Sequence, residues 1–67
     1  MKNFQRWSED SLNRRINSLL YDIEDWERTL SYTNSFIIVK YLEYCIDNAR
    51  KEIRAIKAEL CYREHNG

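Results

Sequence analysis

The apolar side chains of this chain recur at helical spacing in two separate series. The first series consists of Leu12, Ile16, Leu19, Ile23, Trp26 and Leu30, and the second of Val39, Leu42, Ile46, Ala49, Ile53, Ile56 and Leu60. Steps of three and four residues alternate strictly within each series, as they do in a helix that buries one stripe against another helix. No stretch alternates with the period of two that a β-strand requires. The pattern therefore predicts two amphipathic helices.

A polar segment, "SYTNS" at residues 31–35, separates the two series. Ser, Thr and Asn favour turns and helix N-caps over helix interiors. The series are also out of phase: with Ile16, Ile23 and Leu30 as the a positions of a heptad, the next a position is Ile37, whereas the second series begins at Val39. A continuous coiled coil absorbs insertions of three or four residues but not this offset. Two helices are predicted; one long helix is the alternative, because neither Gly nor Pro enforces a turn here.

The start of each helix carries a capping signal. Ser8 is a good N-cap, and Trp7 and Leu12 have the spacing of a hydrophobic staple around it. One of the three residues in the range 33–35 is expected to cap the second helix.

We predict an all-α fold, an antiparallel two-helix hairpin in a single domain over residues 1–67. The first helix is expected over about residues 8–31, the turn over about 32–35 and the second helix over about 35–63. A domain of this size buries only about 60% of the surface of its unfolded chain. Its stability is therefore marginal without disulfides, a metal or oligomerisation.

The placement of the cysteines leaves oligomerisation as the expected source of added stability. Cys45 and Cys61 belong to one predicted helix, in which their backbones stand roughly 24 Å apart, far beyond the reach of a disulfide. Leu20, Ile38 and Cys45 flank the two series and widen each apolar stripe to the width typical of a bundle helix. We therefore predict a homodimer that forms a four-helix bundle, with both series and these three residues in its core.

Several large side chains, most of them aromatic, fall outside this predicted core. Ile37, Tyr41 and Tyr44 are spaced i, i+4, i+7 and share an outward face of the second helix, and Tyr21 is outward on the first. Tyrosine is favoured at protein interfaces because it combines a large contact area with a polar end. Three interpretations stay open: a docking face for another protein, burial within the homodimer, and ordinary exposed surface.

The formal net charge is zero, but the charges are segregated along the chain. Acidic residues cluster near the turn, at Asp22, Glu24, Asp25 and Glu27. Basic residues further from the turn are Arg14, Arg15, Arg50, Arg54 and Lys57. This arrangement fits solvated faces with i,i+4 compensation, a head-to-tail assembly, or phosphate binding by the basic residues. The zero net charge and the lack of interleaved aromatic residues argue against nucleic acid.

Catalytic and metal-binding patterns are weak. The single histidine, His65, lies i+4 from Cys61, and two ligands do not make a structural zinc site. No cofactor, metal or enzymatic activity is expected, because one helical hairpin offers no concave site. The longest apolar run, residues 36–39, is too short to cross a bilayer, and residues 1–11 lack the apolar core of a signal peptide. A cytoplasmic location without membrane contact is expected.

These observations predict a small non-enzymatic regulator or inhibitor that binds another protein. The expected contact residues are Tyr21, Ile37, Tyr41 and Tyr44, with Asp22 and Asp25 steering a basic partner. Regulators of this size are often encoded by bacteria or phages. One alternative is a dimeric hairpin that binds RNA or DNA through its five basic residues, and another is a structural subunit of a larger assembly.

Overall fold

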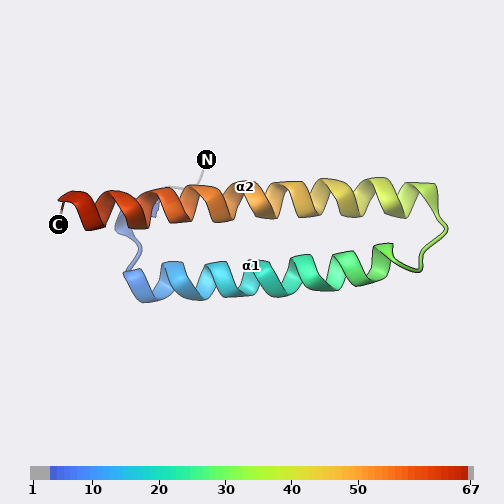
Figure 1. Cartoon of the computed structure of the whole chain (residues 1–67), viewed down its shortest axis with the longest axis horizontal. Helices are drawn as coiled ribbons and strands as arrows, with labels where there is room; N and C mark the ends of the chain where they lie inside the picture. Colours follow the sequence, from blue (N-terminus) through green and yellow to red (C-terminus); the bar gives the residue numbers. More distant parts are fainter. Residues whose placement is uncertain (1–3, 67) are drawn as a thin grey trace.

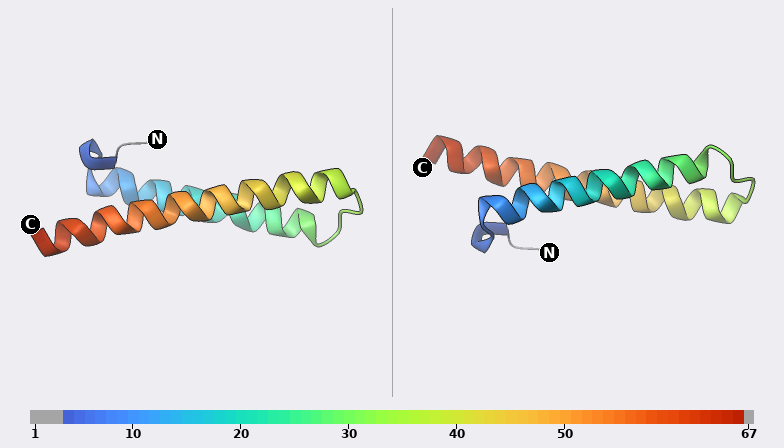
Figure 2. Two further views of the ribbon diagram at one scale, coloured as in Figure 1. Left: turned by 90° about the horizontal axis from the view of Figure 1, so that it is seen from above. Right: turned by 90° about the horizontal axis from the view of Figure 1, so that it is seen from below.

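The computed structural model describes residues 4–66, which form an antiparallel helical hairpin (Figure 1). A short 3₁₀ helix, η1 (Phe4–Arg6), precedes the two long helices α1 (Glu9–Leu30) and α2 (Phe36–Asn66), and residues 4–66 contain no strand. The long helices lie side by side and cross at a shallow angle (Figure 2). The body measures 48 × 19 × 16 Å. The predicted all-helical hairpin is confirmed, and the alternative of one continuous helix is wrong.

Local capping explains where α1 begins and ends. Ser8 is the N-cap, with extended backbone angles, and its Oγ accepts a hydrogen bond of 3.1 Å from the Ser11 N–H. This bond satisfies one of the amide groups that a helix start leaves without an intrahelical partner. At the other end the Ser31 N–H still donates to the Glu27 carbonyl at 3.2 Å, and the chain then leaves the helix.

Replacing the capping Ser8 with Ala is expected to lower the free energy of unfolding by about 1 kcal/mol, because the Ser11 N–H loses its acceptor. Ser18→Ala is the matched control, since Ser18 is exposed in the middle of α1, where Ala is the better helix former. Urea unfolding followed by circular dichroism measures both variants. An equal midpoint for Ser8→Ala and the unchanged protein would contradict the capping role.

Among the three candidate caps of the second helix, the structure selects Ser35. Its carbonyl accepts from the Val39 N–H at 2.9 Å, and its Oγ accepts from the Ile38 N–H at 3.4 Å. Helix α2 then continues to Asn66, three residues beyond the expected end near 63. The added turn is stabilised by Arg63, which pairs with Glu59 at 2.8 Å and also contacts the N-terminal segment.

The two apolar series meet along one seam between α1 and α2. Leu12 and Ile56 are fully buried. The other buried apolar residues are Phe4, Leu19, Ile23, Leu42, Ile46, Ala49 and Ile53. Partly buried residues packed against the core cluster are Trp7, Ile16, Trp26, Leu30 and Leu60. Val39, the first member of the second series, is also partly buried.

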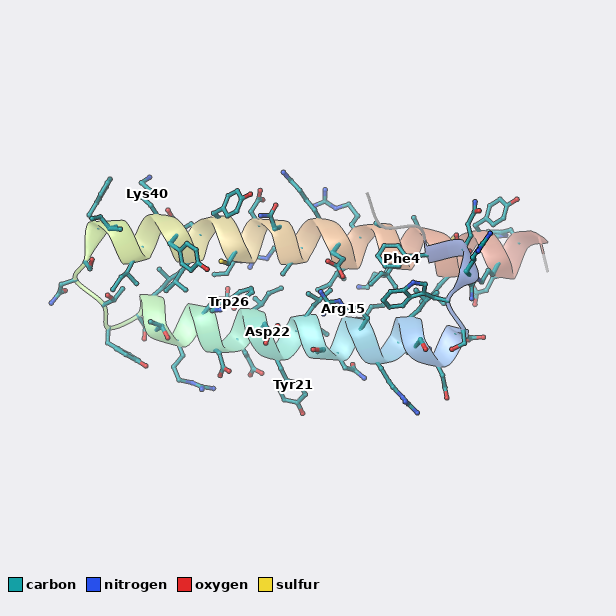
Figure 3. The ribbon with its side chains drawn as sticks, turned by 180° about the vertical axis from the view of Figure 1, so that it is seen from behind. Phe4, Arg15, Tyr21, Asp22, Trp26 and Lys40 are labelled. Carbon is teal, nitrogen blue, oxygen red and sulfur yellow. The ribbon has the colours of Figure 1, made fainter. Side chains whose placement is uncertain are left out.

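The N-terminal segment folds back over the open end of the hairpin. The Phe4 and Trp7 rings pack edge to face with centroids 5.2 Å apart, and Phe4 is buried against the core. The Arg63 Nη2 donates to the carbonyl of Phe4 at 3.0 Å and to that of Trp7 at 2.7 Å. Figure 3 shows Phe4 lying against the late part of α2. A single guanidinium thus fastens the first described residues to the last turns of α2.

Candidate protein-binding surface

The first three turns of α2 expose an unusual concentration of large apolar side chains. They are Phe36, Ile37, Ile38, Tyr41 and Tyr44. A hairpin covers only the face of each helix that meets the other helix, so these side chains on the other faces of α2 stay exposed. Exposed apolar clusters of this kind mark interaction sites in soluble proteins.

The predicted contact residues of α2 form an outer stripe, defined here as Ile37, Tyr41 and Tyr44. All three are exposed, and Ile37 is the most exposed at 78%. Tyr44 lies two residues from both Leu42 and Ile46, which are buried, so it stands on the side of α2 away from α1. The stripe therefore adds nothing to the hairpin core.

Tyr41 lies at the edge of the outer stripe, next to the side of the hairpin that carries Cys45. A hydrogen bond to the Cys45 side chain raises the pKa of Tyr41 above its ordinary value, and Coulombic interaction with Cys45 acts in the same direction. An ordinary tyrosine is already neutral at physiological pH, and a raised pKa keeps Tyr41 a neutral phenol there.

Tyr21 does not join this stripe. It is 71% exposed, and Figure 3 shows its side chain pointing away from α2. Because Tyr44 stands on the far side of α2, the two tyrosines lie on opposite outer surfaces of the hairpin. One flat partner surface cannot contact both.

The acidic cluster near the turn is divided by its ion pairs. Asp25 pairs with Arg28 of its own helix at 3.1 Å, whereas Glu27 reaches across to Arg50 at 3.2 Å. Asp22 is partly buried on the other side of the seam, where its charge helps to raise the pKa of Arg15. Asp22 and Asp25, the two acids expected to steer a partner, therefore lie in different environments.

Side chains of both helices line an open groove between them. Trp26 of α1 and Cys45 and Ala49 of α2 all line this open groove. The Arg15 Nε donates to the Glu52 carboxylate at 2.6 Å beside it. This hydrogen bond is the main cause that raises the pKa of Arg15 above its ordinary value, while partial burial opposes the rise. Figure 3 shows Arg15 and Trp26 between the two ribbons.

The basic residues do not gather into one surface. Arg15 and Arg50 bridge to acids on the opposing helix, at Glu52 and Glu27. Arg14 pairs with Asp10 of its own helix at 3.9 Å. Arg54 and Lys57 make no ion pair within residues 4–66, and they alone of the five offer uncompensated charge for a phosphate.

Two flanking residues expected in the dimer core, Leu20 and Ile38, are exposed in the hairpin, at 49% and 45%. They lie on opposite sides of the seam. Leu20 lies seven residues before Glu27 and therefore shares the side of the Glu27–Arg50 pair. Ile38 and Cys45 lie fourteen and seven residues before Glu52, so they share the side of the Arg15–Glu52 pair.

Sequence reasoning missed Phe36 as part of the exposed group. Phe36 is 73% exposed, and the Lys40 ammonium lies 5.4 Å from the centroid of its ring. The i,i+4 spacing of an aromatic and a basic residue was the signal available for this cation–π contact. Tyr32 and Tyr62 are also exposed, but they lie apart from this group, in the turn and near the end of α2.

In comparisons with known proteins, no family model, curated protein or solved structure matches this chain. Within residues 4–66, no helix combines the length and apolarity needed to traverse a membrane. The same residues bring together no group of three or more His, Cys, Asp or Glu side chains that could hold a metal ion. Cys45 and Cys61 are free thiols.

Proposed function

We propose that this protein is a small, non-enzymatic, cytoplasmic regulator that inhibits or controls another protein by binding it through the outer stripe. The observation that supports the proposal is the exposure of Ile37, Tyr41 and Tyr44 on a helix face that the hairpin does not use. In this proposal the protein acts as a homodimer, a four-helix bundle that presents two such stripes.

Physical chemistry favours these side chains as contacts. Burying one large apolar side chain contributes about 1.5–3 kcal/mol, and the tyrosines add hydroxyl groups that can donate hydrogen bonds at the edge of an interface. The stripe sits on a regular helix, so its side chains are already arranged before a partner arrives. A preformed surface loses less conformational freedom on binding than a loop does.

Photo-crosslinking tests the proposal directly. A photoreactive phenylalanine analogue at position 44 is expected to form a discrete covalent adduct with another protein in cells that produce this chain. The same analogue at position 62 is the matched control, because Tyr62 is an equally exposed tyrosine near the other end of α2. Mass spectrometry identifies the adducts.

The substitution Ile37→Glu in the chain labelled at position 44 is expected to remove the adduct, because it places a charge within the contact while the core stays intact. Adducts of equal yield at positions 44 and 62 would contradict a specific contact through the stripe. Adducts at position 44 that join only two copies of this chain would assign the stripe to the homodimer and refute the proposed partner.

A further inference from the structure

One side of the hairpin has an apolar patch distinct from the outer stripe. We define the lateral patch as Trp26, Ile38 and Cys45, with Tyr41 at its border. Trp26 and Cys45 line the same groove between the helices, and Ile38 lies two helical turns before Cys45 on the same side of α2. Neighbouring residues Ile37 and Ile38 differ in position, because a step of one residue turns about 100° around the helix axis.

The chain itself covers the continuation of this side at the open end of the hairpin. Arg63 lies eighteen residues after Cys45, which is five full turns, so the two share one side of α2. At the level of Arg63, the segment containing Phe4 and Trp7 lies over the helices. At the level of Cys45, no described segment covers them. The half of this side near the turn is left open to another chain.

Charge distinguishes the two sides of the seam. The side opposite the lateral patch has a groove lined by two apolar residues, Leu30 and Ile46, and four charged ones, Glu27, Glu43, Asp47 and Arg50. Its three acids are held in ion pairs with Arg50, Lys40 and Lys51. A two-fold interface pairs a surface with its own copy, so joining two such grooves would take three ion pairs per copy out of water, at a cost in desolvation.

The side that carries the lateral patch has few charged residues, so it can pack against the same side of a second copy. Tyr41 and Asn48 continue the row of Ile38 and Cys45 along α2, and none of these four is an acidic or basic residue. Arg15 and Glu52 neutralise each other at one end, and Asp22 is a single acid in the wall of the groove. Such a surface can face its own copy while burying fewer charged groups than the opposite groove would.

We infer that a second copy of this chain docks on the lateral patch, with the two-fold axis passing near Cys45. This inference rests on the homodimer in the proposed function and assigns the surface through which the two copies meet. The contact joins the halves near the turns, because the segment around Phe4 and Trp7 occupies the open end in each copy. Leu20 lies outside the contact, and Ile37 and Tyr44 of each outer stripe stay available to a partner.

Paired substitutions at adjacent residues test the surface. Sedimentation equilibrium is expected to show a dimer of the full chain, which Ile38→Glu weakens by about 100-fold or more, because each copy would bury an unpaired carboxylate in the apolar contact. Ile37→Glu is expected to leave the dimer unchanged within about threefold. Weakening by Ile37→Glu with no effect of Ile38→Glu would overturn the inference, as would a chain that stays monomeric at every concentration.

The native cysteines give a second test that does not depend on a charged variant folding. A short bismaleimide is expected to link two copies of the Cys61→Ala variant through Cys45, and not two copies of the Cys45→Ala variant through Cys61. Two outcomes would overturn the inference. One is linkage through Cys61 and not through Cys45, and the other is a proven dimer that is linked through neither cysteine. A monomer that still yields the photo-adduct at position 44 would refute this interface while leaving partner binding through the outer stripe intact.

Discussion

Replacing Ile56 with Ala is expected to lower the free energy of unfolding of the hairpin by about 2–5 kcal/mol. The Ile56 side chain is fully buried between the helices, so the substitution removes apolar contact and leaves a cavity that two thin helices cannot fully close. Domains of this size rarely have more than about 3–5 kcal/mol of stability from their core. The variant is therefore expected to be largely unfolded, as a loss of helical circular dichroism at 25 °C.

The same substitution at Ile37 is the matched control. Ile37 lies on the same helix but is 78% exposed, and Ala is the better helix former, so Ile37→Ala is expected to change stability by no more than about 0.5 kcal/mol. An equal loss at both positions would mean that the outer stripe is buried in the folded assembly, in conflict with its proposed availability to a partner.

Replacing Arg63 with Ala is expected to release the N-terminal segment and to lower the free energy of unfolding by about 1–3 kcal/mol. The guanidinium donates to three backbone carbonyls, those of Phe4, Gln5 and Trp7, and pairs with Glu59. No neutral side chain offers donors in the same fixed fork. Without it, the aromatic side chains of the segment lose the anchor that holds them over the core.

Tryptophan fluorescence reports this release. In a Trp26→Phe background the emission comes from Trp7, and Arg63→Ala is expected to shift it to longer wavelength as the indole enters water. Arg54→Ala serves as control, because Arg54 is an exposed arginine of α2 with no ion pair within residues 4–66. Emission that stays unchanged in the Arg63 variant would show that ring packing alone holds the segment.

The core was predictable from the sequence because its signal is periodic. The strict steps of three and four residues placed Leu12 and Ile56 on the inner faces, and both are fully buried. The polar composition of residues 31–35 likewise indicated the turn, since Ser, Thr and Asn favour such positions whatever the rest of the chain does.

The N-terminal segment was not predictable in this way. Its anchor joins Arg63 to carbonyls 56 to 59 residues earlier in the chain, and a contact between a side chain and distant backbone leaves no trace in any local pattern. Arg63 also explains why α2 runs past its expected end, because tertiary contacts stabilise a turn that would otherwise fray.

The candidate surface was predicted only in part for a related reason. The exposure of Ile37, Tyr41 and Tyr44 could be predicted because they lie opposite the seam residues of α2. That position is set by the spacing of residues within α2 alone. The separation of Tyr21 from them depends on how α1 is rotated against α2. The ion pairs between the helices, such as that of Arg15 with Glu52, depend on the same relation. Composition and spacing within one helix do not determine how the two helices are rotated against each other.

The anchor of the N-terminal segment also has a consequence for the order in which the molecule assembles. The two helices are joined by a short turn, so they can pair quickly once the first turns of α2 exist, as expected for contacts of low sequence separation. The anchor needs Arg63, which lies 59 residues after Phe4 and is synthesised after all of α1. During synthesis Phe4 and Trp7 therefore stay exposed to solvent and to chaperones until the rest of the hairpin is complete.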